Sequence, residues 1–182
     1  MGPQTLPRLT LVLGGAGSGK SRYAERLIED CAAPWLYIAT AQAYDDEMRE
    51  RIALHCSRRG GSWQTVDVPL DLAGAIREAP RGMPVLVDCL TLWLSNVMLA
   101  ERDVESEQAA LISALENARG QTVLVTNEVG LGIVPENALA RRFRDAQGRL
   151  NARVAEIADR VVLIAAGLPL TLKSPSQEGP AQ

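Results

Sequence analysis

The sequence is poor in cysteine, which excludes a protein held together by a disulfide framework or by a zinc site. Its three cysteines, Cys31, Cys56 and Cys89, are odd in number and lack the paired spacing of metal ligands. Residues 1–7 carry no basic segment followed by an apolar one, and no apolar run approaches the length that spans a bilayer. We therefore expect three reduced, partly buried thiols and a cytoplasmic protein.

A basic excess is also absent, which argues against a nucleic-acid-binding protein. The 182 residues include 19 Lys and Arg against 22 Asp and Glu, for a net charge of −3. Binding to a phosphate backbone requires clustered positive charge. The arginines of residues 141–153 are accompanied by Asp145 and Glu156, which is typical of a solvated helix face. The expected partner is a small molecule.

The length and the hydrophobic content of 47% suit one domain with a single core. Residues 1–7 and 174–182 are rich in Pro, Ser, Gln and Gly and have little to bury, so both are expected to be flexible tails. We therefore place a single domain at residues 8–173.

Lysine is scarce, and one of the two lysines lies in the most informative stretch of the chain. Residues 14–21 match the phosphate-loop spacing Gly-x4-Gly-Lys-Ser/Thr at every fixed position. In such a loop, backbone N–H groups converge on phosphate oxygens, the lysine reaches the terminal phosphates, and the final hydroxyl is a ligand for Mg²⁺. A chance glycine-rich turn is the alternative, but an apolar strand before the motif and an amphipathic helix after it favour a nucleotide site. The predicted loop contacts are Gly14, Gly15, Ala16, Gly17, Ser18, Gly19, Lys20 and Ser21.

Hydrophobic patterning predicts strands that alternate with helices. The strands are expected at residues 9–13, 35–39, 63–68, 84–88, 121–125, 160–165 and 168–173. The helices are expected at residues 21–31, from 45 to the glycines at 60–61, and at 69–79, 91–99, 105–118 and 136–159. This order predicts an α/β fold of the P-loop NTPase (RecA-like) type. Its sheet is mostly parallel, with helices on both faces and the last strand antiparallel at an edge.

Ligands of such sheets bind beyond the carboxyl ends of the strands. This rule brings the phosphate loop together with residues 40–42, 88–91 and 126–128. Asp88 stands where a P-loop protein holds Mg²⁺ through a carboxylate, although an aspartate there is also suited to capping the next helix. Glu128 is suited to ordering a water or a substrate hydroxyl, and a plain loop carboxylate is an equal interpretation.

The only histidine, His55, is a candidate nucleophile. On a helix, Arg51, Arg58 and Arg59 would lie around its ring, where guanidinium groups stabilise phosphate oxygens and disfavour the charged imidazole. A neutral imidazole can attack phosphorus and form a phosphoramidate. A solvated, arginine-rich helix end explains the same spacing equally well.

Several further sequence blocks occur in the same order as in a known protein family. Together they resemble the bifunctional adenosylcobinamide kinases and adenosylcobinamide-phosphate guanylyltransferases of cobalamin biosynthesis, over nearly all of residues 9–173. Besides the phosphate loop, the blocks are Tyr-Ile-Ala-Thr-Ala-Gln at 37–42, Asp-Asp-Glu-Met at 45–48, Arg-Ile-Ala-Leu-His at 51–55, Val-Asp-Cys-Leu-Thr-Leu-Trp-Leu-Ser-Asn at 87–96, Val-Thr-Asn-Glu-Val-Gly at 125–130 and Ile-Val-Pro-Glu-Asn at 133–137.

The resemblance implies two reactions. GTP or ATP phosphorylates the hydroxyl of the aminopropanol arm of adenosylcobinamide, and GMP from GTP is then joined to that phosphate, giving adenosylcobinamide-GDP. In this family the GMP passes through a histidine, and the matching residue is His55. A homo-oligomer, a trimer in related enzymes, is also implied. The further nucleotide contacts that the resemblance implies are Ala39, Thr40, Ala41, Cys56, Ser57, Arg58, Arg59 and Asp67.

The sequence departs from the family pattern in three places. Gly17 stands where the family usually has arginine, Cys56 and Arg59-Gly60 stand where it has Arg and Arg-Pro, and Asp67 replaces a usual glutamate. An arginine over the phosphates stabilises the charge of the transition state, so a glycine at position 17 is expected to make the kinase step less efficient.

The expected kinase step uses Lys20 and the loop amides, together with Mg²⁺ held through Ser21 and Asp88, to stabilise the transferred phosphoryl group. Two other functions are compatible with a phosphate loop: a P-loop small-molecule kinase without the nucleotidyl step, and a GTP-binding switch without transfer chemistry.

Overall fold

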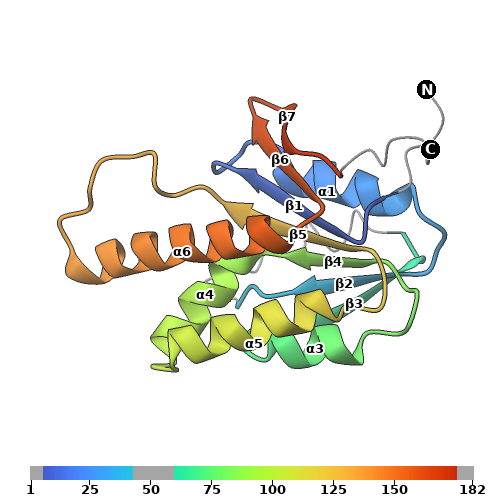
Figure 1. Ribbon diagram of the computed structural model, residues 1–182, viewed down its shortest axis with the longest axis horizontal. Coiled ribbons are helices and arrows are strands. Elements are labelled where there is room, and N and C mark those ends of the chain that lie inside the picture. The colour runs from blue at the N-terminus through green and yellow to red at the C-terminus, as the bar shows by residue number, and fades with distance from the viewer. Residues whose placement is uncertain (1–5, 43–59, 176–182) are drawn as a thin grey trace, which may run out of the picture.

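The computed structural model describes residues 6–42 and 60–175, and its strands form one sheet in the order β3-β2-β4-β5-β1-β6-β7 (Figure 1). All neighbouring strands are parallel except β6 and β7, which are antiparallel. The predicted α/β sheet with an antiparallel edge strand is therefore confirmed. The strands are β1 (Leu9–Gly14), β2 (Trp35–Ala39), β3 (Trp63–Asp67), β4 (Val85–Asp88), β5 (Thr122–Asn127), β6 (Arg160–Ala165) and β7 (Leu168–Lys173).

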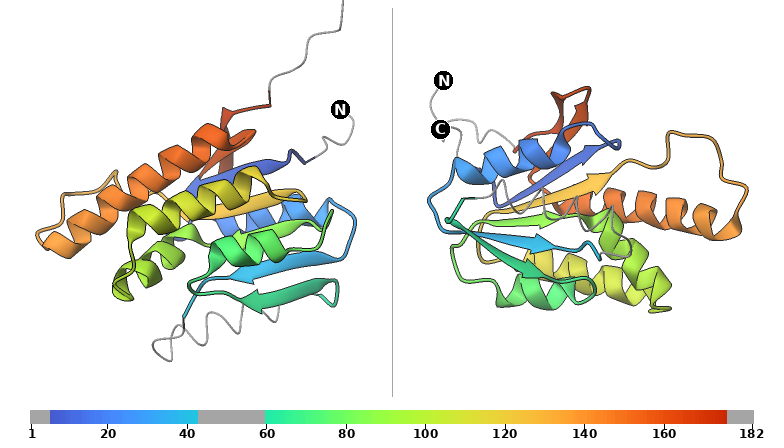
Figure 2. Two further views of the ribbon diagram at one scale, coloured as in Figure 1. Left: turned by 60° about the horizontal axis from the view of Figure 1, so that its bottom comes forward. Right: turned by 180° about the vertical axis from the view of Figure 1, so that it is seen from behind.

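Helices cover both faces of the sheet, as predicted (Figure 1, Figure 2). Among the described helices, α1 (Lys20–Glu29) packs against one face, called here the α1 face. The opposite face is covered by α3 (Leu72–Glu78), α4 (Leu90–Leu99), α5 (Val104–Glu116) and α6 (Ala138–Ile157). The helix predicted to begin at residue 45 lies outside the described residues.

The alternation of side chains along the strands assigns each strand-end residue to a face. In β4, Val87 packs on the four-helix face and Leu86 on the α1 face, and Val125 of β5 also packs on the α1 face. Since successive side chains of a strand point to opposite faces, Asp88 and Asn127 share the α1 face. Two strand-end polar residues are thus directed to the same side of the sheet as the helix that follows the phosphate loop.

Two helices begin later than the sequence predicted, and a side-chain cap explains each start. The helix expected at 69–79 begins at Leu72, because the Asp71 side chain accepts a hydrogen bond from the Gly74 backbone N–H. The helix expected at 136–159 begins at Ala138, after Asn137, whose Oδ1 accepts from the N–H groups of residues 139 and 140. Such caps satisfy backbone donors that have no partner within the helix.

Two of the three cysteines lie in the described part of the chain, and both are free thiols. Cys31 is half-buried and Cys89 is buried, as expected, whereas Cys56 lies outside the described residues. Within residues 6–42 and 60–175, no helix combines the length and the apolar character needed to cross a bilayer.

Candidate functional site

The phosphate loop connects β1 directly to α1, which confirms the predicted order of strand, loop and helix. β1 ends at Gly14 and α1 begins at Lys20. Gly17 and Gly19 have φ angles of 68° and 91°, a left-handed backbone that favours glycine. The loop is tied to the turn between β6 and β7, where the Gly167 N–H donates to the carbonyl of Ser18 over 3.0 Å. The loop backbone is therefore held in place by its neighbours.

Gly14 is required by a close approach of the chain. A Cβ placed on Gly14 would lie 2.4 Å from the Ser18 Oγ and 2.8 Å from the carbonyl oxygen of Ile164. A Cβ placed on Gly15 would meet no atom within 4 Å.

These surroundings predict different effects for two neighbouring substitutions. Gly14→Ala should lower the free energy of unfolding by about 1–3 kcal/mol, because a methyl group is forced against backbone in a packed site. Gly15→Ala is the matched control and should change stability little. Urea unfolding followed by circular dichroism measures both variants. Equal stability of the two would contradict the close approach of Ser18 and Ile164 to Gly14.

Lys20 is the first residue of α1, and its side chain bonds back to the phosphate loop. Its ammonium donates to the carbonyl of Gly15 over 3.2 Å. Burial raises the pKa of the Cys89 thiol to about 11, the negative charge of Asp88 adds to this rise, and the positive charge of Lys20 opposes it. The helix that begins at Lys20 packs on the same face of the sheet as Leu86 and Cys89, at the carboxyl end of β4.

Asp88 is oriented by a tyrosine and does not cap the following helix. The Tyr37 hydroxyl donates to Asp88 Oδ2 over 3.1 Å. The cap position of α4 belongs to Cys89, whose side chain makes no capping bond. The interpretation of Asp88 as a helix cap is therefore wrong, and its carboxylate remains at the edge of the α1 face, beside the phosphate loop's helix.

The end of β2 is bonded to the end of β4 through Thr40. The Thr40 hydroxyl donates to the carbonyl of Cys89 over 2.7 Å and accepts from the Cys89 N–H over 2.8 Å. Asn96 of α4 donates to the Thr40 carbonyl over 2.8 Å. Thr40 is fully buried, while Ala39 and Ala41 are half-buried. The observed contacts of Thr40 therefore tie the end of β2 to the end of β4.

Asp67 is exposed at the end of β3 and pairs in register with Ala39. Three strands separate β3 from β1. At a spacing of about 4.8 Å per strand, Asp67 lies about 19 Å from Gly14 along the sheet edge. The predicted contacts His55, Cys56, Ser57, Arg58 and Arg59 lie outside the described residues.

A buried polar network beneath the site joins β5 to α4 and α6, and the sequence did not predict it. Thr126 donates to Asn151 Oδ1 over 2.8 Å, and Gln147 donates to the same oxygen over 2.8 Å. Thr91 Oγ1 and Thr126 Oγ1 lie 3.5 Å apart. The available signal was a polar residue in an apolar strand, together with polar residues of α6 at helical spacing from the apolar Leu150 and Val154. Glu128, by contrast, accepts from the Gly130 N–H of its own loop, which fits the loop-carboxylate interpretation.

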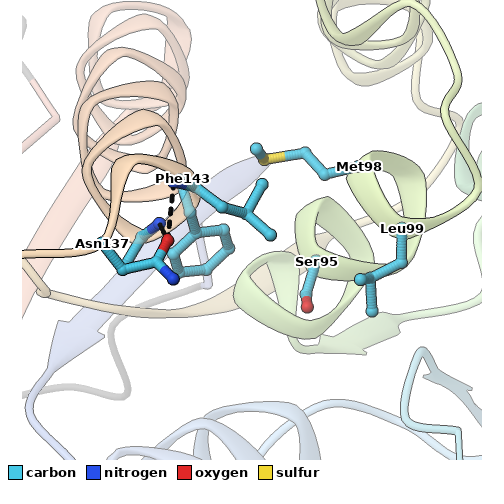
Figure 3. A pocket seen from close by; sticks show the side chains of 7 residues that line it. Ser95, Met98, Leu99, Asn137 and Phe143 are labelled. Carbon is cyan, nitrogen blue, oxygen red and sulfur yellow. Dashed lines mark hydrogen bonds between the residues drawn. The ribbon is translucent and has the colours of Figure 1, made fainter.

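A separate, mostly apolar pocket of about 350 Å³ lies between α4 and the start of α6. Ser95, Met98 and Leu99 of α4 face Asn137 and Phe143 across it (Figure 3). None of its lining residues belongs to the phosphate loop or to the predicted nucleotide contacts. The pocket is therefore distinct from the phosphate-binding edge.

Comparison with known proteins identifies a family and two similar bifunctional enzymes. The model of a family described as cobinamide kinase / cobinamide phosphate guanyltransferase matches residues 10–172. A bifunctional adenosylcobalamin biosynthesis protein (CobP) of Pseudomonas aeruginosa is 49% identical over 166 residues, covering 90% of this chain and 96% of the relative. A bifunctional adenosylcobalamin biosynthesis protein (CobU) of Salmonella typhimurium is 43% identical, covering 91% of this chain and 99% of the relative.

Solved structures show the fold at much lower sequence identity. The flagellar accessory protein FlaH of Methanocaldococcus jannaschii has a TM-score of 0.54 at 14% identity, covering 96% of this chain and 82% of that chain. An ATPase of a bacterial type III secretion system has a TM-score of 0.53 at 13% identity, covering 90% of this chain and 56% of that chain. These likenesses support the P-loop NTPase fold alone.

Proposed function

Because the chain belongs to the family of cobinamide kinases and cobinamide phosphate guanyltransferases, we propose that it phosphorylates adenosylcobinamide with GTP or ATP and then joins GMP from GTP to the new phosphate. The observation that carries this proposal is a complete phosphate loop in a chain 49% identical to a bifunctional relative. The product is adenosylcobinamide-GDP.

The kinase step is assigned to the edge formed by the phosphate loop and the ends of β4 and β5. The loop N–H groups and the Lys20 ammonium bind the β- and γ-phosphates. The substrate hydroxyl attacks the γ-phosphorus, the bond to the β–γ bridging oxygen breaks, and the nucleoside diphosphate leaves. The bond from the Lys20 ammonium to the Gly15 carbonyl supports this assignment, because it keeps the lysine beside the loop.

Ser21 and Asp88 fit a site for Mg²⁺ that is completed by the nucleotide. Both offer oxygen atoms, which Mg²⁺ prefers, and Asp88 lies on the α1 face, which is covered by the helix that contains Ser21. Within residues 6–42 and 60–175, no group of three or more acidic, histidine or cysteine side chains is placed so that it could hold a metal ion by itself. Mg²⁺ commonly takes only one or two protein ligands and fills its shell with phosphates and waters. When bound, it would neutralise charge on the phosphate oxygens.

The role of Asp88 leads to a prediction on the metal dependence. Asp88→Asn should raise the Mg²⁺ concentration that gives half-maximal phosphorylation by about tenfold or more, because it removes a charged ligand or its hydrogen bond to a coordinated water. Tyr37→Phe, which removes the hydroxyl that donates to Asp88 but keeps the carboxylate, should have a smaller effect. Mg²⁺ titrations of the initial rate measure both variants. An unchanged requirement in Asp88→Asn would exclude this role.

The GMP transfer is assigned to His55. Its neutral imidazole attacks the α-phosphorus of GTP and expels pyrophosphate, and the phosphate of the first product then attacks the same phosphorus and frees the histidine. The nucleotide contacts proposed for this step are Ala39, Thr40, Ala41, Cys56, Ser57, Arg58, Arg59 and Asp67. Asp67 is about 19 Å along the edge from the loop, a distance that suits the base or ribose end of a nucleotide rather than its phosphates.

A homo-oligomer, as implied by related enzymes, is also proposed. Three apolar side chains between β5 and α6 are strongly exposed: Leu131 at 88%, Ile133 at 97% and Val134 at 60%. Clustered apolar surface of this kind supports a contact between proteins. Sedimentation equilibrium measures the mass, and a monomer at micromolar concentration would contradict an oligomer.

One product analysis separates this function from two others. The protein is mixed with adenosylcobinamide, GTP and Mg²⁺, and the corrinoids are identified by chromatography and mass. The proposed enzyme yields adenosylcobinamide phosphate and then adenosylcobinamide-GDP. A monofunctional kinase stops at the phosphate, and a GTP-binding switch leaves the corrinoid unchanged. Either of these last two results would overturn the proposal.

A further inference from the structure

β5 lies between the strand that leads into the phosphate loop and the strand that ends in Asp88. In the register of the sheet, Gly14 pairs with Asn127, and Asp88 pairs with Val125. Asn127 therefore stands beside the first residue of the loop and two residues, about 7 Å, beyond the level of Asp88. Its side chain lies on the α1 face, as does that of Asp88. An amide is thus placed between the loop and the proposed metal ligand.

The side chain of Asn127 has an unmet hydrogen-bonding capacity. Its Oδ1 is buried and has no hydrogen-bond partner among the described residues. Nearly all buried polar side-chain atoms in folded proteins have a partner, so an exception calls for an explanation, such as a catalytic role. An asparagine amide offers two N–H donors and one acceptor oxygen.

The backbone of Asn127 is held on both sides by side chains from the opposite face of the sheet. Thr91 of α4 accepts from the Asn127 N–H over 2.8 Å, and Asn151 of α6 donates to the Asn127 carbonyl over 3.1 Å. Asn151 is itself fixed by Thr126 and Gln147, each 2.8 Å from its Oδ1. Four polar side chains therefore serve to fix one strand-end residue. This arrangement explains the polar network beneath the site.

We propose that Asn127 is a catalytic residue of the phosphoryl transfer, and that Thr91 and Asn151 are its positioning residues. The inference rests on the proposed kinase function. The Asn127 Nδ2 donates a hydrogen bond to an oxygen of the γ-phosphate, and this bond strengthens as the P–O bond to the departing diphosphate breaks. The Asn127 Oδ1 accepts from the attacking hydroxyl and so orients its oxygen toward phosphorus. The hydroxyl loses its proton to water as the new O–P bond forms, and the nucleoside diphosphate leaves with the electrons of the broken bond.

The test compares phosphorylation of adenosylcobinamide by the wild type with that by Asn127→Ala and Asn127→Asp. We expect kcat to fall about 10²-fold in Asn127→Ala, the usual effect of losing one transition-state donor, and at least as far in Asn127→Asp, whose charge repels phosphate. The Kd for a non-hydrolysable GTP analogue should change less than about threefold in Asn127→Ala. Asn117→Ala, which alters an asparagine bonded to Ser113 on the exposed end of α5, is the matched control.

The positioning role is tested by Asn151→Ala and by Thr91→Val. Thr91→Val nearly keeps the side-chain volume, so it remains a test if Asn151→Ala does not fold. Each should lower kcat about tenfold. Residues that act through one another do not have additive effects. Hence Asn127→Ala combined with Asn151→Ala should be no slower than Asn127→Ala alone. Rates of Asn127→Ala within about threefold of the wild type, or effects that multiply in the double variant, would overturn the inference.

GTP hydrolysis without a corrinoid distinguishes this inference from the function on which it rests. It cleaves the same β–γ bond with water as the acceptor. If the wild type hydrolyses GTP but leaves adenosylcobinamide unphosphorylated, the proposed function fails. A loss of about 10²-fold in hydrolysis by Asn127→Ala would still support its contact with the γ-phosphate. If the wild type cleaves no γ-phosphate with either acceptor, both proposals fail.

Discussion

Replacing Lys20 with alanine is expected to lower the rate of adenosylcobinamide phosphorylation by at least about 10³-fold, the largest effect of any single substitution on the kinase step. Lys20 is the only charged side chain of the phosphate loop, and its ammonium donates to the Gly15 carbonyl of that loop. Negative charge grows on the phosphoryl oxygens in the transition state, and the substitution removes the cation that would stabilise it. Initial rates with saturating GTP, measured by release of the labelled γ-phosphate into corrinoid product, give the effect.

The chain provides its own control for this substitution, because Lys173 is the only other lysine. Its ammonium donates to the carbonyls of Ala155 and Glu156 near the carboxyl end of α6, remote in the sheet order from β4. Lys173→Ala should lower the free energy of unfolding by about 0.5–1.5 kcal/mol and leave kcat unchanged. Equal loss of activity in the two lysine variants would indicate general destabilisation rather than a role of Lys20 at the phosphates.

Replacing His55 with alanine is expected to abolish covalent labelling of the protein by GTP carrying a label in its α-phosphate. The wild type should acquire an acid-labile label, as a phosphoramidate does, because the imidazole is the proposed acceptor of GMP. The variant should still convert adenosylcobinamide to its phosphate, since the γ-phosphate transfer depends on the phosphate loop. Its products should therefore stop at the first step. Labelling of His55→Ala equal to that of the wild type would end the histidine proposal.

The two variants together separate the reactions. Lys20→Ala loses phosphate transfer to the corrinoid, whereas His55→Ala retains it and loses GMP transfer. Supplying chemically prepared adenosylcobinamide phosphate to each variant tests the second step alone. Failure of His55→Ala to use this substrate is the expected result. Normal conversion by His55→Ala would show that GMP reaches the corrinoid without a covalent histidine intermediate.

The elements, and the strand, loop and helix around residues 14–21, were predictable from the sequence because they depend on local patterns. Apolar strands alternating with helices specify a parallel sheet, and the loop motif of residues 14–21 specifies a phosphate site at the end of β1. The carboxyl-end rule also brought residues 88–91 and 126–128 to the same edge. Local sequence patterns thus predicted the strands, the helices and the residues at the carboxyl edge of the sheet.

The order of the parallel strands was not predictable in the same way. Nothing in the sequence of β5 states that it lies between β1 and β4, since the sheet order results from packing of the helices and from the connections between strands. The choice between a cap and a free carboxylate at Asp88 likewise depended on the Tyr37 hydroxyl, which is 51 residues away in the chain. Asn127 was among the residues expected at the edge, but the role proposed for it depends on the sheet order and on the contacts of Thr91 and Asn151.

The most direct test of the account uses GTP labelled separately in its α- and γ-phosphates, with adenosylcobinamide as acceptor. If the protein transfers both groups, the final corrinoid product contains one phosphorus from the γ-position and one from the α-position, and one pyrophosphate is released per molecule. A corrinoid product that carries only the γ-label would contradict the proposed GMP transfer, and a corrinoid without either label would contradict both reactions.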